Sequence, residues 1–133
     1  MDLRVLLVDD ESTSLHIISS LLEKGLAEKQ HSVHIDMARY PEKALDLIAE
    51  LKKTGQNYDF ITCDYSMPGM SGREFQETVR KTQNIPFIFI SAGAIGPGKE
   101  ELEKPDNTYA IPKPIDAAEL ENAVSSVLYS LDK

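Results

Sequence analysis

The 133-residue sequence has no tryptophan and a single cysteine, Cys63, and no long apolar run. One cysteine cannot form a disulfide within the chain, which excludes a small scaffold stabilised by disulfides. No apolar run approaches the roughly 20 residues that cross a bilayer, so no membrane span is expected. The apolar run that ends at Val8 is short and acids follow it directly, which argues against a signal peptide. The sequence therefore predicts a cytoplasmic protein without a membrane anchor.

Basic side chains are scarce. Fourteen Lys and Arg stand against 22 Asp and Glu, for a formal net charge of −8. An acidic surface repels phosphate backbones, so direct nucleic-acid binding by this chain is not expected. Repeats and Gly/Ser linkers are absent, while 41% of the residues are hydrophobic. This composition predicts one domain over residues 1–133 with its own core, and no output domain in this chain.

Short apolar runs alternate with longer helical patterns along the chain. Five runs predict strands: 4–8, 33–37, 60–63, 87–90 and 109–111. The helical patterns between and after them favour an α/β fold, a doubly wound five-stranded parallel sheet with helices on both faces. In such sheets, ligands bind outside the carboxyl ends of the strands.

Capping residues mark where several helices should begin. Ser12 or Thr13 is available to cap the first helix, and Pro41 suits the first turn of the second. Ser71 and Glu74 have the spacing of a capping box, and Asp116 can cap the last helix. Between 96 and 105 the only apolar residue is Leu102, so any fourth helix should be short and weakly held. We expect residues 92–107 to be the least ordered part of the chain.

Polar side chains follow four of the predicted strands. The first strand ends in Asp9-Asp10-Glu11, and Asp64, Ser91 and Lys113 follow the third, fourth and fifth. Clustered carboxylates repel one another unless a cation bridges them, and Mg²⁺ suits an oxygen site that also accepts phosphate oxygens. Lys113 and Ser91 can then hold phosphoryl oxygens. The pattern predicts covalent phosphoryl transfer to Asp64, which stands alone at the end of a central strand.

Four segments in this order carry a family resemblance: Val8-Asp9-Asp10-Glu11, the stretch from Asp64 to Gly72, Ser91-Ala92, and Lys113-Pro114. Together they resemble the receiver domain of response regulators in two-component signalling, over essentially the whole chain. The resemblance implies a flavodoxin-like (β/α)5 sheet with strand order 2-1-3-4-5. It also implies a signalling module and not an enzyme, apart from its own phosphoryl transfer and autodephosphorylation.

The resemblance assigns the phosphoacceptor role to Asp64, with a sensor histidine kinase or a histidine phosphotransfer protein as the donor. Asp10, Asp64 and the backbone carbonyl of Ser66 would ligate Mg²⁺, and Asp9 would act through a metal-bound water. Ser91 and Lys113 would hold the phosphoryl oxygens. The Lys113-Pro114 bond is expected to be cis. A downstream partner protein, which the sequence does not identify, would read the changed surface.

One position departs from the family pattern. Three residues before Lys113 the family usually carries an aromatic residue that swings inward on phosphorylation, whereas this chain has Ala110, with Tyr109 one place earlier. Strand side chains alternate between faces, so Tyr109 should point the opposite way and cannot substitute. Because receivers often pair through the face that this change alters, a monomer is expected.

Two alternatives stay open at this stage. An aspartate-nucleophile phosphatase uses Mg²⁺, Asp and Lys on a similar sheet, but it needs Asp-x-Asp after the first strand, where this chain has Asp9-Asp10-Glu11. A pseudo-receiver would bind partners without phosphorylation, although the complete set of site residues argues against that interpretation.

Overall fold

The computed structural model describes residues 1–92 and 99–131, and within them five parallel strands form one sheet. The order β2-β1-β3-β4-β5 confirms the predicted fold class and strand order. The strands are β1 (Asp2–Val8), β2 (Ser32–Ala38), β3 (Phe60–Asp64), β4 (Phe87–Ser91) and β5 (Thr108–Pro112). Because β1 lies between β2 and β3, the direction of winding reverses there, and the carboxyl ends of β1 and β3 flank the position expected for a ligand.

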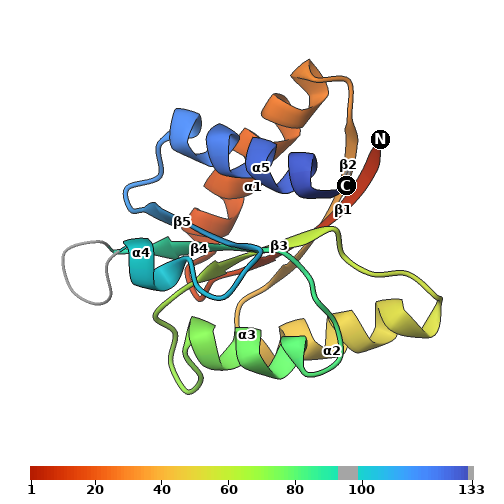
Figure 1. The fold of residues 1–133 in the computed structure, drawn as a ribbon, viewed down its shortest axis with the longest axis vertical. Coiled ribbons are helices and arrows are strands. Elements are labelled where there is room, and N and C mark those ends of the chain that lie inside the picture. Colours follow the sequence, from red (N-terminus) through yellow and green to blue (C-terminus); the bar gives the residue numbers. More distant parts are fainter. Residues whose placement is uncertain (93–98, 132–133) are drawn as a thin grey trace.

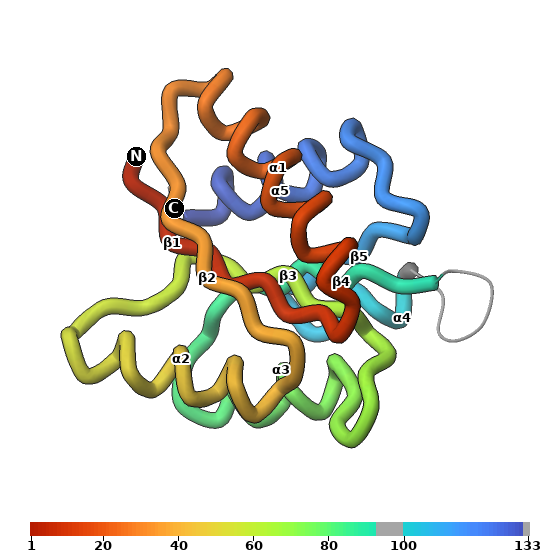
Figure 2. The backbone as a smooth tube through the Cα atoms, turned by 180° about the vertical axis from the view of Figure 1, so that it is seen from behind, coloured from red at the N-terminus to blue at the C-terminus, as the bar shows by residue number. Residues whose placement is uncertain are grey.

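Helices cover both faces of the sheet (Figures 1 and 2). α1 and α5 pack on one face, and α2 and α3 on the other, so two apolar clusters lie on opposite sides of the strands. The helices are α1 (Ser12–Glu28), α2 (Pro41–Lys53), α3 (Gly72–Arg80), α4 (Lys99–Leu102) and α5 (Ala117–Leu131). β3 and β4 are buried along their whole length and β1 along most of it, which explains their continuous apolar sequences.

Three of the predicted helix starts are confirmed. The Ser71 hydroxyl accepts from the Glu74 N–H (3.1 Å) and the Glu74 carboxylate accepts from the Ser71 N–H (3.0 Å), a complete capping box. Asp116 accepts from two backbone N–H groups at the start of α5. Pro41 is the first residue of α2.

The predicted cap of α1 was wrong. Ser12 and Thr13 lie inside the helix, and Glu11 occupies the cap position without a side-chain cap hydrogen bond. The turn is instead organised by Asp9, whose carboxylate accepts from the Glu11 N–H at 2.9 Å. The helix therefore starts one residue earlier than a Ser12 cap would allow.

α4 is short, as predicted, with four residues. Its apolar residue Leu102 is only 3% exposed and packs into the cluster on the α2 and α3 face. The stretch 92–107 that we expected to be least ordered includes 93–98, which lie outside the described residues, so that expectation stays a prediction.

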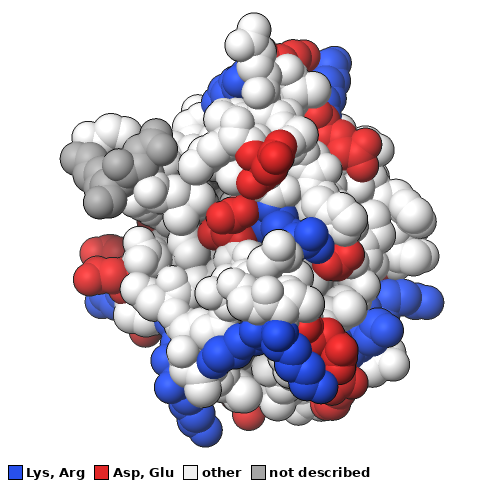
Figure 3. Space-filling view, turned by 90° about the vertical axis from the view of Figure 1, so that its right-hand side faces the viewer, with Lys and Arg blue, Asp and Glu red and all other residues white. Residues whose placement is uncertain are grey.

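Charges of both signs alternate over the face shown in Figure 3, so the acidic excess forms no single patch there. Within residues 1–92 and 99–131, no helix combines the length and the hydropathy of a membrane-spanning segment.

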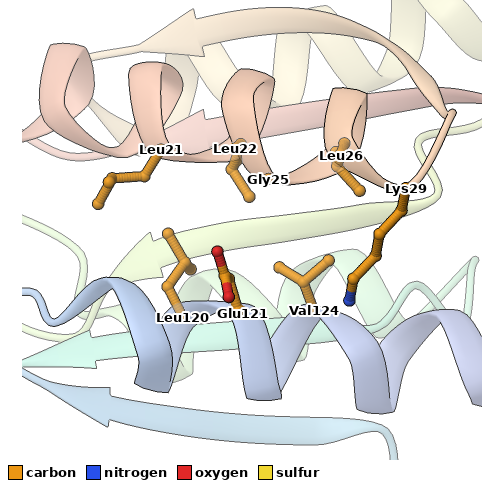
Figure 4. Close-up of a pocket in the computed structure, with 8 residues that line it drawn as sticks. All are labelled: Leu21, Leu22, Gly25, Leu26, Lys29, Leu120, Glu121 and Val124. Carbon is orange, nitrogen blue, oxygen red and sulfur yellow. The ribbon is translucent and has the colours of Figure 1, made fainter.

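Gly25 lies in the interior of α1, at the shallow groove between α1 and α5 (Figure 4). A Cβ added there would lie 3.6 Å from Glu121 Oε1, an ordinary van der Waals contact. We expect Gly25→Ala to raise the free energy of unfolding by about 0.5–1 kcal/mol, because alanine loses less backbone entropy in a helix. Urea unfolding followed by circular dichroism measures this change. A lower midpoint than that of the unmodified chain would show that the groove does not tolerate a methyl group.

Candidate functional site

Four strands deliver the predicted site residues to one edge of the sheet. Asp9 directly follows β1, Asp64 ends β3, Ser91 ends β4, and Lys113 directly follows β5. The Lys113 N–H donates to the Ser91 carbonyl at 2.7 Å, which joins the ends of the last two strands. Ile90, the neighbour of Ser91, is the register partner of Asp64. The convergence expected from the sequence is therefore confirmed.

The Lys113 ammonium is the centre of this group. Its Nζ lies 3.4 Å from Asp64 Oδ2 and 3.5 Å from Asp9 Oδ2. It also lies 3.6 Å from Glu11 Oε1, although the Glu11 side chain is 65% exposed. Glu11 was not among the predicted site residues, and the only sequence signal for it was its place in a run of three acids. One cation thus faces three carboxylates.

Burial makes the two inner carboxylates hard to ionise. Asp9 and Asp64 side chains are only 1% and 9% exposed. Burial raises the pKa of Asp64 to about 6; the Lys113 charge opposes this rise and the Asp9 charge adds to it. Burial also raises the pKa of Asp9, against the Glu11 N–H and the Lys113 charge. Ionising either carboxylate in this buried position is costly, and added positive charge nearby would lower that cost.

The surrounding carboxylates raise the pKa of the Lys113 ammonium as well. Burial by itself would lower the pKa of Lys113, but the charges of Asp64, Asp9 and Glu11 outweigh that effect and raise it. Lys113 is therefore a permanent cation at the site near neutral pH.

Among the described residues, one group of three acids has carboxylate oxygens close enough to share a metal ion. One oxygen from each of Asp9, Asp10 and Asp64 lies within 4.8 Å of the others. Carboxylate oxygens are the ligands that hard divalent cations such as Mg²⁺ take in proteins. The residues therefore fit the predicted metal. Ser66 lies beside them, because its N–H donates to Asp64 Oδ1 at 3.3 Å; a metal contact of its carbonyl stays a prediction.

The backbone after Asp64 is tightly packed against the start of α3. The Gly72 N–H donates to the Tyr65 carbonyl at 2.7 Å. A Cβ at Gly72 would lie 2.8 Å from the Asp64 carbonyl oxygen and 2.9 Å from Tyr65 Cα, closer than real Cβ atoms approach. Glycine at this position lets α3 fix the segment that carries Asp64. On the opposite side of the site, the Lys113-Pro114 bond is cis, as predicted.

The alternation predicted for Tyr109 and Ala110 is confirmed. Ala110 packs into the cluster on the α2 and α3 face, whereas Tyr109 packs against the α1 and α5 cluster. The Tyr109 hydroxyl lies 3.2 Å from the Ser130 hydroxyl of α5. Tyr109 is therefore on the wrong face to replace the aromatic residue expected at position 110.

Comparisons with known proteins agree with this geometry. The family model of the response regulator receiver domain matches residues 5–125. The chain is a member of the receiver domain family. It is 27% identical to the chemotaxis protein CheY-3 of Vibrio cholerae over 134 residues, covering 98% of this chain and 95% of that protein. The receiver domain of the Francisella response regulator 1452 superposes with a TM-score of 0.69 at 27% identity, over 98% of both chains.

Longer relatives also contain a matching segment. The two-component response regulator ARR12 of Arabidopsis thaliana is 34% identical over 90 residues, which cover 68% of this chain. The chain spans 20% or less of the length of the Arabidopsis regulators that it matches. Family membership favours the receiver interpretation over the phosphatase and pseudo-receiver alternatives.

We expect Asp64→Asn to raise the free energy of unfolding at pH 8 by about 2 kcal/mol in a buffer with EDTA. The folded-state pKa of Asp64, about 6, is above its unfolded value, so the folded chain binds more protons and loses stability as pH rises from about 4 to 6. Asparagine has no charge to bury, so the gain should shrink toward zero at pH 4. Chemical denaturation at pH 4, 6 and 8 measures it.

Asp46→Asn, at an exposed position on α2, is the matched control and should show no such dependence. An equal gain from Asp64→Asn at pH 4 and pH 8 would contradict a burial cost for the ionised Asp64 carboxylate.

Proposed function

We propose that Asp64 is the phosphoacceptor of this receiver domain and that it takes its phosphoryl group from a phosphohistidine. The observation that carries the proposal is the convergence of Asp9, Asp10 and Asp64 on a single edge of the sheet together with Lys113. Asp9 also contacts the ammonium and belongs to the three-acid group, but its side chain is only 1% exposed against 9% for Asp64, so Asp64 is the more accessible of the two carboxylates.

The transfer is a substitution at phosphorus. An oxygen of the ionised Asp64 carboxylate attacks the phosphorus atom, the P–N bond to the donor imidazole breaks, and the imidazole nitrogen keeps the electron pair and then takes a proton. With a pKa of about 6, most Asp64 carboxylates are ionised at neutral pH and available as the nucleophile. Lys113, already within 3.4 Å of Asp64 Oδ2, would neutralise a phosphoryl oxygen, and Ser91 would hydrogen-bond to another.

Asp9, Asp10, Asp64 and the Ser66 carbonyl would hold Mg²⁺, with Asp9 acting through a bound water. The bound ion would supply positive charge to the phosphoryl oxygens and to the crowded carboxylates. The chain's own part is to hold those carboxylates in place by hydrogen bonds that favour their ionised form. Asp9 does this through its bond from the Glu11 N–H, and Asp64 through its bond from the Ser66 N–H.

Hydrolysis of the acyl phosphate returns the domain to its first state. A water oxygen attacks phosphorus, the bond to the Asp64 oxygen breaks, and inorganic phosphate leaves. This self-limited cycle is the only reaction we propose, and it makes the domain a switch and not an enzyme that acts on other substrates.

The donor we propose is a sensor histidine kinase or a histidine phosphotransfer protein, and the reader is a separate protein that contacts the modified surface. Because phosphohistidine in such donors is formed from cytoplasmic ATP, the proposal places the domain in the cytoplasm. A monomeric state is part of the proposal.

Incubation with acetyl phosphate and Mg²⁺ should add one phosphoryl group to the chain, detected by intact-protein mass spectrometry. The adduct should be lost in EDTA and absent from Asp64→Asn, because the acceptor and the metal are both required. Asp46→Asn changes an equivalent group on the exposed side of α2 and should form the adduct normally. An adduct on Asp64→Asn, or one that forms equally in EDTA, would refute the proposal.

A further inference from the structure

One face of α3 is polar and reaches toward the segment between α4 and β5. Arg73, Gln76 and Arg80 follow one another at intervals of three and four residues, which places them on the same side of the helix. Their hydrogen-bond partners lie between residues 101 and 108, apart from Ile85 and contacts among themselves. This polar face is our α3 seam: Arg73, Gln76 and Arg80.

Arg73 holds the end of α4. Its guanidinium donates to the carbonyls of Glu101 (3.0 Å) and Leu102 (3.1 Å), and also to the carbonyl of Lys104. The last carbonyls of a helix have no partners within the helix, and a cation there also suits the helix dipole. α4 has four residues and one buried apolar side chain, so it cannot be stable on its own. The packing of Leu102, the bond from the Ala110 N–H to the Glu103 carboxylate and the Arg73 bonds to the carbonyls hold it in place.

The same guanidinium also lies over an aromatic ring of β4. The carbon at the centre of the Arg73 guanidinium is 5.1 Å from the ring centroid of Phe89. The Phe89 ring packs edge-on against Tyr65 at 5.5 Å, and Tyr65 directly follows Asp64. Phe89 is also two residues before Ser91 on β4, so both side chains leave the strand on the same face. A shift of the end of β3 or of β4 would therefore move a neighbour of the Phe89 ring or the ring itself.

Alanine at position 110 leaves Phe89 as the bulky side chain at this place. Ala110 is the register partner of Phe89 on β5, and both belong to the cluster on the α2 and α3 face. A methyl group has no alternative rotamers with which to report a change at Ser91. The bulky side chain between the site and α4 is therefore Phe89 on β4, and the Arg73 guanidinium lies over its ring.

We propose that Arg73 couples the acceptor site to α4, so that phosphorylation of Asp64 changes how firmly Arg73 holds the α4 carbonyls. In the unmodified state Arg73 bridges Phe89 and the end of α4, as observed. When Ser91 and Lys113 close on the phosphoryl group, Phe89 moves with β4, the guanidinium loses its place over the ring, and α4 is released. The inference rests on the function proposed for Asp64, which supplies the change that it transmits.

Arg80 provides a matched control on the same seam. Its guanidinium donates to the carbonyls of Asp106 and Asn107, both at 2.8 Å, and lies 5.6 Å from the Phe87 ring centroid. Arg80 therefore holds the segment between α4 and β5 by the same kind of bonds, but it lies over Phe87, which is two residues further from Ser91 on β4 than Phe89 is. If coupling depends on contact with Phe89, Arg80 stabilises the connection without transmitting the change.

Hydrogen exchange of peptides spanning 99–104 tests the proposal in the full chain, with and without acetyl phosphate and Mg²⁺. Intact mass gives the phosphorylated fraction of each sample. In the chain without substitutions, phosphorylation should raise the rate of hydrogen exchange over 99–104 about threefold or more. Arg73→Met should exchange faster before phosphorylation and respond little to it, while forming the adduct normally. Arg80→Met should keep the response, and Arg73→Lys, which keeps the charge without the forked donors, should lie between.

Each contrary result has a distinct meaning. If the chain without substitutions forms the adduct but its exchange over 99–104 does not change, the coupling is overturned and the function proposed for Asp64 stands. A full response in Arg73→Met also overturns it. If the chain without substitutions forms no adduct, the proposed function is refuted, and the coupling with it.

Discussion

A single ammonium, that of Lys113, faces the carboxylates of Asp9, Glu11 and Asp64, and the site depends on this unequal balance of charge. Two of the three carboxylates are almost fully buried, where an unpaired charge is costly. The fold keeps them there by backbone hydrogen bonds and by the lysine, but not by a matching number of cations. Added positive charge would lower the cost of ionising these carboxylates, which is the property that a metal-assisted phosphoryl acceptor needs.

The topology explains why the imbalance arises at this place. Winding reverses between β1 and β3, so Asp9 and Asp64 come from adjacent strands at the ligand position of the sheet. Lys113 arrives from the far edge, and its N–H bond to the Ser91 carbonyl fixes how far it can reach. Close packing of Gly72 against the backbone of Asp64 fixes Asp64 relative to α3. The segment that carries the Asp64 carboxylate is thus also the segment that packs against the start of α3.

The fold and the inner site could be predicted because both follow from repeating geometry. Apolar runs indicate buried strands, and the carboxyl ends of parallel strands meet, so Asp9, Asp64 and Lys113 had to converge. Alternation along β5 likewise determined which way Tyr109 points. The cap of α1 was mispredicted because capping propensity favours serine and threonine, whereas the helix begins at Ser12 and Glu11 holds the cap position without a side-chain cap bond.

Contacts between a long side chain and distant backbone could not be predicted. Arg73 reaches carbonyls about 30 residues away, and no periodic pattern marks that pairing. The pairing of Glu11 with Lys113 depends on the rotamer of an exposed side chain, which sequence spacing does not determine. Sequence spacing alone therefore indicates neither the contacts between Arg73 and α4 nor the contact between Glu11 and Lys113.

The ionisation of Asp64 is the most direct measure of the charge imbalance. Carboxyl ¹³C chemical shifts of labelled protein, titrated with and without Mg²⁺ and assigned with Asp64→Asn, report the pKa of this one group. We expect a value of about 6 without the ion, raised by burial, and a value well below it when Mg²⁺ is bound. An ordinary aspartate pKa that Mg²⁺ leaves unchanged would contradict both the burial cost and the role of Asp64 in holding the metal.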